Sequence, residues 1–182
     1  AAGCALSGVY DVFFFVRAES TGGILLEVCQ VPMPNDPYDR RNWNPRWAEG
    51  MPSGLLRLDH IACAVTEMNT PLRFFTELLD GKILSDERVT TPQPARRVFV
   101  RLGDKNVAFV CADDAGSGPI GAFLSKPNSG IYAMVWQVED VARSKAVFAG
   151  KGLGIVEQDC IGGSFAIDPR DFRNARHEFK AP

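Results

Sequence analysis

The pattern of apolar and polar positions in this sequence repeats after 73 residues. The segment LDHIACAVTEMNTPLRFF lies over IYAMVWQVEDVARSKAVF without a gap. Each copy opens with a largely apolar strand, Leu58–Val65 or Ile131–Val138, and continues as a helix. A glycine, Gly81 or Gly154, then allows the left-handed turn that closes a helix. Because self-similarity at a fixed spacing indicates repeated structural units, we interpret the two segments as copies of one unit.

The two predicted helices carry their own start and stop signals. Asn69 or Thr70 can cap the first helix, and Gly81 ends it. The second helix opens at Glu139-Asp140 and stops in the glycine-rich segment 150–154. Three strand candidates follow each helix: Lys82–Val89, Val98–Leu102 and Asn106–Cys111 in the first copy, and Gly154–Gln158, Ser164–Asp168 and Ala175–Phe179 in the second. Each copy therefore reads β-α-β-β-β, which predicts an α+β fold.

A second similarity, at a spacing of 151 residues, involves the N-terminus. The segment that starts at Phe14 lies over the segment that starts at Phe165, so that Glu27 falls on Glu178. We therefore predict three regions: residues 1–30 as the last two strands of a preceding unit, residues 31–56 as a linker rich in Pro, Asn, Asp and Gly, and residues 57–182 as a domain of two units, 57–112 and 129–182. Trp43 and Trp47 are expected to pack the linker onto a domain surface.

Composition narrows the possible partners of the chain. A net charge of −2 over 182 residues provides no electrostatic basis for binding nucleic acid or an anionic membrane. The longest strongly apolar stretch, Val12–Val16, is far too short to cross a bilayer, and no secretory leader is visible. Five widely spaced cysteines without a C-x-x-C motif favour free thiols and a cytoplasmic location.

Several of these segments resemble one known superfamily. RLDHIACAV is similar to the first strand of units in glyoxalases, methylmalonyl-CoA epimerases and extradiol dioxygenases, which often read L-D-H-I-x-x-x-V. STGGILLEVCQ and NARHEFKAP resemble the closing strand, and FAIDPRD resembles the segment before it. The resemblance to this vicinal-oxygen-chelate superfamily implies paired βαβββ units forming a curved mixed sheet around a cleft. It also implies the C-terminal part of a two-domain member.

The same resemblance implies a metal centre and suggests its ligands. Members bind a small oxygenated substrate through adjacent oxygens on a divalent metal, which stabilises an enolate or activates dioxygen. His60 matches the histidine of the first strand, and Glu178 matches the glutamate of the last strand, which would also be catalytic. This pair suits Fe, Mn, Co, Ni or Zn. The other two ligand positions hold Ala133 and Ala108, which weakens the dioxygenase interpretation.

The side chains next to these ligand positions differ in the strand face that they are expected to take. His177 adjoins Glu178, and Tyr132 adjoins Ala133, so both are expected to face away from the ligand positions. Gln137 shares the face of Ala133 and is the better candidate for a weak ligand or a substrate contact. His60 could equally be a buried histidine with a structural role, and Glu27 is expected to be structural. The arginines Arg96, Arg97, Arg173 and Arg176 could attract an anionic substrate, although such pairs are usually solvated.

Three functions remain open. The first is a divalent-metal-dependent lyase, isomerase or ring-cleaving dioxygenase that acts on a small molecule. The second is a metal-free binding module, with Phe99 and Trp136 among the residues lining the cleft. The third is a structural or dimerising half with a degenerate site. Because strand edges without partners associate readily, residues 9–30 are also expected to pair with a second copy or with a missing N-terminal fragment.

Overall fold

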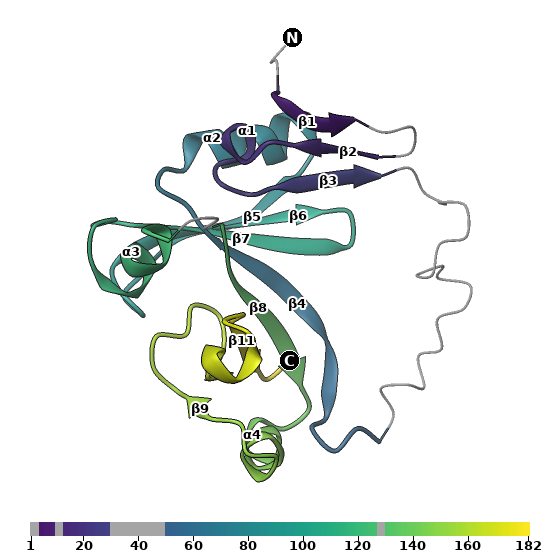
Figure 1. Ribbon diagram of the computed structural model, residues 1–182, viewed down its shortest axis with the longest axis vertical. Coiled ribbons are helices and arrows are strands. Elements are labelled where there is room, and N and C mark those ends of the chain that lie inside the picture. Colours follow the sequence, from purple (N-terminus) through teal and green to yellow (C-terminus); the bar gives the residue numbers. More distant parts are fainter. Residues whose placement is uncertain (1–3, 10–12, 30–49, 127–129) are drawn as a thin grey trace.

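The strands of the protein form two sheets. The computed structural model describes residues 4–9, 13–29, 50–126 and 130–182. Within these residues, a three-stranded sheet from the N-terminus lies beside an eight-stranded sheet (Figure 1). The predicted anchors Trp43 and Trp47, and most of the predicted linker, lie outside the described residues. No helix in the described part is long and apolar enough to cross a membrane.

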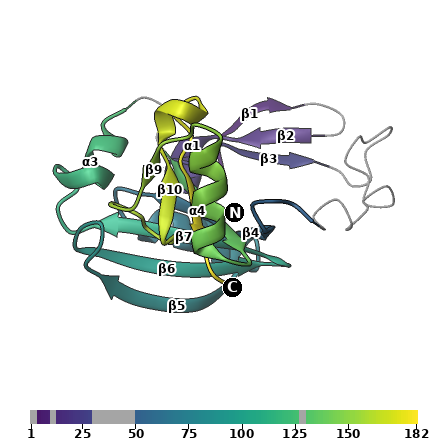
Figure 2. The same ribbon diagram turned by 90° about the horizontal axis from the view of Figure 1, so that it is seen from below.

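The eight-stranded sheet consists of the two predicted units. The first unit comprises β4 (Leu55–Ala64), α2 (Asn69–Arg73), the π-helical turn η3 (Phe74–Leu78), β5 (Lys82–Val89), β6 (Ala95–Leu102) and β7 (Lys105–Ala112). The second comprises β8 (Ile131–Val138), α4 (Val141–Gly150), β9 (Ile155–Val156), β10 (Phe165–Ile167), the 3₁₀ turn η4 (Pro169–Phe172) and β11 (His177–Lys180). Figure 2 shows α4 lying beside the strands of the second unit.

The strand order β5-β6-β7-β4-β8-β11-β10-β9 is the same in both units when each is followed from the centre outwards. In each unit the first strand pairs with the last in parallel, as β4 pairs with β7 and β8 with β11. The two first strands, β4 and β8, pair antiparallel at the centre and join the units into one curved, unclosed sheet. The predicted α+β architecture of paired βαβββ units is confirmed.

The helix signals were only partly right. The side chains of Asn69 and Thr70 do not cap α2. Instead the carboxylate of Glu67 accepts the backbone N–H groups of both residues, at 2.7 and 2.9 Å. The helix α4 opens next to Glu139-Asp140 as expected, and the Asp140 carboxylate caps it by accepting the N–H of Arg143 at 2.9 Å. The short helix α3 (Gly118–Leu124), which joins the two units, was not predicted.

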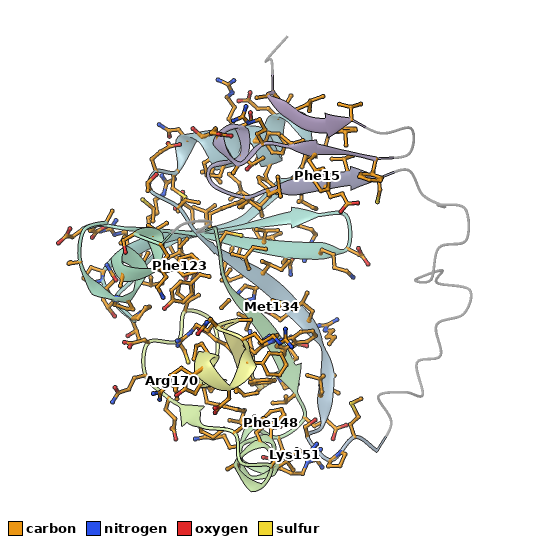
Figure 3. All side chains as sticks on the ribbon, viewed as in Figure 1. Phe15, Phe123, Met134, Phe148, Lys151 and Arg170 are labelled. Atoms are coloured by element: carbon orange, nitrogen blue, oxygen red, sulfur yellow. The ribbon has the colours of Figure 1, made fainter. Side chains whose placement is uncertain are left out.

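Alternating residues of the central strands face opposite sides of the large sheet. Cys63 and Val65 belong to a core in which Phe75 of η3 packs on Phe109 of β7, and we call this side the helix face. His60, an odd number of residues before Cys63, points to the other side, which we call the His60 face. Phe123 of α3 is labelled in Figure 3. Its ring packs on that of Tyr132, with 5.1 Å between the ring centroids.

The N-terminal sheet has three strands where two were expected. It consists of β1 (Leu6–Val9), β2 (Phe13–Val16) and β3 (Leu26–Cys29), with the short helix α1 (Ala18–Thr21) between β2 and β3. Val16 and Ile24 are buried in the same core as Phe74 and Phe75. One face of the small sheet therefore packs on α2 and η3 of its own chain.

Candidate functional site

Two rows of residues cross the centre of the His60 face. In the first row, Val135 of β8 is the register partner of both His60 on β4 and Glu178 on β11. The two ionisable residues therefore lie two interstrand spacings apart, roughly 9.5 Å between Cα atoms. In the second row, Ala62 of β4 is the partner of both Ala108 and Ala133. The structure thus brings all four predicted ligand positions to one face, and half of them are alanine.

His60 is almost entirely buried, with 2 % of its surface exposed, and is held by its neighbour. Its Nδ1 lies 2.7 Å from Oδ2 of Asp59, and its ring packs edge-on against Phe99 at 4.9 Å. Adjacent residues on a regular strand could not meet in this way. Here the register of β4 shifts between Leu58 and His60, which brings Asp59 within reach.

The other ring nitrogen of His60 is free to act as an acceptor. A neutral imidazole that donates its Nδ1 proton to a carboxylate carries a lone pair on Nε2. Among the described residues, Nε2 has no hydrogen-bond partner. Burial lowers the pKa of His60 below its ordinary 6.5, although Asp59 acts in the opposite direction. The ring is therefore neutral at pH 7, which suits a proton acceptor or a metal ligand.

Asp59 connects His60 to a small polar network. Nε2 of Gln137 donates to Asp59 at 2.6 Å, and Oε1 of Gln137 accepts from Nε of Arg57 at 2.8 Å. Lys180 lies 3.6 Å from the same carboxylate. Burial raises the pKa of Asp59, but the hydrogen bond from His60 and the charge of Lys180 outweigh it and leave the pKa lowered. Gln137 therefore holds the residue that orients His60.

Glu178 is completely buried and fully hydrogen-bonded. Its carboxylate accepts the backbone N–H groups of Ile161, Gly162 and Gly163, at distances from 2.8 to 3.1 Å. Nε of Arg176, which lies two residues earlier and just before β11, adds a charged donor at 2.8 Å. Three N–H groups and one guanidinium thus compensate the buried charge, which would otherwise be very costly.

Residues 157–164, which we call the covering loop, connect β9 to β10 and lie across this face. Gly162 packs so closely on His60 that a Cβ atom at 162 would come within 2.7 Å of Nε2. A Cβ atom at Gly163 would similarly come within 2.6 Å of Cβ of Glu178. Only glycine permits such a backbone approach. The loop therefore lies directly over both predicted ligands.

The donor set does not fit a divalent cation in this arrangement. The oxygens of Glu178 are occupied by four donors, and Gly162 covers Nε2 of His60. No group of three or more His, Cys, Asp or Glu side chains able to hold a metal occurs within residues 4–9, 13–29, 50–126 and 130–182. Metal binding by His60 and Glu178 remains a prediction of the sequence.

The remaining predicted residues divide between the two faces. Phe99 lies against His60, with 4.9 Å between the ring centroids, and its role in lining a cleft remains a prediction. Trp136 lies on the helix face, where it packs near Phe148 and donates through Nε1 to Nδ1 of His177 at 3.0 Å. His177 therefore faces away from Glu178, as predicted.

Tyr132 does not face away from Ala133. Both residues belong to one buried cluster, because the pairing of β4 with β8 shifts between Ala62 and Cys63. Sequence reasoning also missed Asp59, and it treated two arginines of the site, Arg97 and Arg176, as solvated. The available signal for Arg176 was its spacing of two from Glu178, which places both on one strand face.

Comparison with solved structures identifies proteins of the same fold. A methylmalonyl-CoA epimerase from Mycobacterium tuberculosis matches with a TM-score of 0.63 and 20% identity, over 72% of this chain and 93% of that one. A hypothetical protein from Bacillus halodurans matches with a TM-score of 0.61 and 23% identity, over 69% and 94%. A Streptomyces coelicolor methylmalonyl-CoA epimerase in complex with 2-nitronate-propionyl-CoA matches at 0.60 and 20%, over 69% and 96%. Neither a protein-family model nor a curated protein matches the sequence significantly.

These similarities establish the fold of the chain. Methylmalonyl-CoA epimerases belong to the vicinal-oxygen-chelate superfamily that the sequence resembles. About seven-tenths of this chain matches nearly the whole of each similar protein, so the chain carries residues beyond the shared fold. That the chain is the C-terminal part of a two-domain protein remains a prediction.

Proposed function

We propose that this chain is an isomerase-type enzyme in which His60 exchanges a proton at a carbon next to a carbonyl group of a small molecule. The observation that carries the proposal is the buried Nε2 of His60, which has no partner among the described residues. Asp59 orients the ring through Nδ1, in the way that a carboxylate orients a catalytic histidine. The epimerase names of the similar structures support this class of reaction.

The proposed step needs only the residues of this chain. Nε2 takes the proton, and the electrons of the broken C–H bond move onto the carbonyl to form an enolate. Arg97 and Arg176, both partly buried on the His60 face, are the cations placed to stabilise the enolate oxygen. The imidazolium exchanges its proton with solvent and then protonates the enolate carbon, which completes the exchange. A proton delivered to the other face of the planar enolate gives the isomer.

The test follows deuterium from solvent into the substrate. The full chain is incubated in D₂O with methylmalonyl-CoA and other 2-substituted acyl thioesters, and loss of the proton next to the carbonyl is monitored by NMR. His60→Gln should slow the exchange at least about 100-fold, a typical contribution of a general base. His177→Gln is the matched control, because it changes the only other histidine, on the opposite face. Equal rates in the two variants would refute the role of His60.

The pH and the metal ions of the exchange reaction are varied as two further tests. The exchange rate should fall as the pH drops below 6.5, because protonation removes the lone pair of a histidine whose pKa burial has lowered. Parallel reactions with a chelator and with Mn²⁺, Fe²⁺, Co²⁺, Ni²⁺ or Zn²⁺ test the predicted metal. If proton exchange requires an added ion, the metal-independent step is wrong. The chain is then the metal-dependent enzyme that the sequence predicts.

The second candidate is a metal-free binding module. Saturation of Glu178 by its own loop favours it, because this carboxylate is not available to a metal or a substrate in the described arrangement. Binding of a thioester without any proton exchange would support the module and exclude the isomerase for that substrate.

A further inference from the structure

We infer that the covering loop is an internal plug, and that a ligand binds by displacing Ile161 and taking over the loop's hydrogen bonds to Arg97 and Arg176. This inference rests on the proposed function, since it concerns access to the same site. Three observations support it: a side chain of the loop fills the space over the two rows of residues, two arginines hold the loop in place, and a hollow lies beside it.

The loop fills the space with an apolar side chain. Ile161 has only 3 % of its surface exposed and packs in one cluster with Ala62, Ala95 and Ala133. Small side chains on three strands therefore make room for one branched group, and Ile161 provides it. A ligand that replaces this side chain must offer a compact, branched apolar group of similar volume.

Both units of the fold fasten the loop through its carbonyl oxygens. Nη1 of Arg97, from β6 of the first unit, donates to the carbonyl of Ile161 at 2.6 Å. Nη2 of Arg176, just before β11 of the second unit, donates to the carbonyl of Gln158 at 3.1 Å. If the loop moves away, both guanidinium groups lose these carbonyl acceptors, although Arg97 keeps Glu87 and Arg176 keeps Glu178. Glu178 then loses the N–H groups of the loop, so that Arg97 is the cation with more free donors for an anionic ligand. A ligand with a carboxylate can satisfy them, since guanidinium groups bind carboxylates in a bidentate manner.

A hollow beside the plug provides the route of approach. It has a volume of about 410 Å³ and is lined by Val89, Thr90, Thr91, Arg97 and the loop residues 160–163. The hollow and the buried Nε2 of His60 are therefore separated by the loop backbone at Ile161 and Gly162. Displacement of this backbone joins the hollow to the base.

The ligand class follows from these contacts: a small molecule with a branched apolar group beside a carboxylate. The probe is 2-methylbutanoate, which joins the sec-butyl side chain of isoleucine to a carboxylate, and 2-methylbutanamide is its uncharged control. Binding to the full chain is measured by NMR titration. Hydrogen exchange of the amides at 158–164 is followed at the same time.

Ile161→Ala should raise the affinity for 2-methylbutanoate at least tenfold, because the ligand no longer has to displace a side chain. Ile167→Ala is the matched control, since Ile167 has the same 3 % exposure but lies in the cluster with Phe165 and Phe179 on the helix face. This control should leave the affinity unchanged. Gly162→Ala, whose added Cβ clashes with His60, should accelerate exchange in the loop at least tenfold without filling the apolar space.

The remaining variants test whether Arg97 binds the carboxylate of the ligand, and they separate the proposed plug from the proposed isomerase. Arg97→Gln should abolish the preference for the carboxylate over the amide. Equal affinity in the wild type and Ile161→Ala, or binding that leaves the amides of 158–164 unperturbed, would overturn the plug. Each titration is repeated in His60→Gln, which lacks the base but keeps the loop. If the ligand opens the loop of the wild type and no proton exchange occurs, the plug is supported and the isomerase is refuted.

Discussion

The two ends of the chain contain the same hairpin in two different settings. In the N-terminal sheet, Phe15 pairs with Glu27, and in the large sheet Ala166 pairs with Glu178, which is the same register displaced by 151 residues. The turn segments also agree, since α1 and η4 occupy equivalent positions. Each is followed by two residues with positive φ: Gly22 and Gly23 in one, Arg173 and Asn174 in the other. The predicted similarity therefore extends to backbone conformation.

The environments of the two carboxylates are nevertheless opposite. Glu178 is completely buried, whereas Glu27 is exposed. Arg176 stands two residues before Glu178, and the equivalent position before Glu27 is Leu25, with 61 % of its surface exposed. β11 also pairs with β8, while β3 is an edge strand of its sheet in the described residues (Figure 1). The hairpin alone does not bury a carboxylate, because burial also requires a cation and a covering strand and loop.

The largest expected effect follows from removing each carboxylate. Glu178→Ala should lower the free energy of unfolding by about 3–5 kcal/mol, because it leaves Arg176 and three N–H groups buried without their acceptor. Glu27→Ala should change it by no more than about 0.5 kcal/mol, as usual for an exposed residue. Urea denaturation of both variants measures the difference. Similar losses in the two variants would contradict the contrast between the ends.

The next effect comes from making the C-terminal hairpin resemble the N-terminal one. Arg176→Leu should cost about 3 kcal/mol, since one charged donor to the buried Glu178 is lost while three N–H groups remain. The reverse change, Leu25→Arg, should be nearly neutral because position 25 is exposed. Urea denaturation again provides the measurement. An unchanged free energy of unfolding in Arg176→Leu would show that the three N–H groups alone compensate the buried charge of Glu178.

A smaller effect is the pH dependence of stability that the two histidines of the large sheet produce. Burial lowers the pKa values of His60 and His177 below 6.5 in the folded state, so the unfolded chain binds more protons in acid. Stability from these groups is fully present above pH 6.5 and is lost as the pH falls towards their folded pKa values. Each unit of pKa difference is worth about 1.4 kcal/mol.

The histidine variants test this assignment. His60→Gln and His177→Gln should each flatten the dependence of the unfolding free energy between pH 7 and 5, and the double variant should remove the histidine part. The charges of Asp59 and Glu178 raise the pKa of His60 and that of Lys180 lowers it, so these groups modify the contribution of His60 to the pH dependence. A slope that persists in the double variant would have to come from carboxylates.

The smallest effect on stability, but a visible one on molecular mass, concerns the edge of β3 that has no strand partner among the described residues. We propose that the wild-type chain associates through the N-terminal sheet, where Val9, Leu25 and Leu6 are exposed beside strand edges. Light scattering should then give a mass above the 19.9 kDa of one chain. Leu25→Lys should restore the monomer without measurable loss of stability. A wild-type monomer, with the strands satisfied by their own chain, would refute the association.

Sequence reasoning identified the repeated units because their signals are local. Alternating apolar residues at 58–65 and 131–138, the Asp140 cap and the 151-residue similarity each depend on neighbours along the chain. The resemblance to the vicinal-oxygen-chelate superfamily implied that His60, Glu178, Ala108 and Ala133 stand at ligand positions of one cleft, and the strand register brings all four to one face. The cap of α2 was wrong because the helix already begins at Asn69, so that the N–H groups of Asn69 and Thr70 lie in its first turn and Glu67 accepts them.

The sequence by itself therefore determined the fold, the pairing of the two units and the face on which the site lies. Only the tertiary structure decided what that site contains. A register shift brings Asp59 to His60, and a loop distant in sequence surrounds Glu178 with N–H groups and places Gly162 over the imidazole. The physical reason is that periodicity is a property of neighbouring residues. The partners of a buried charge, in contrast, depend on which distant backbone crosses it after folding.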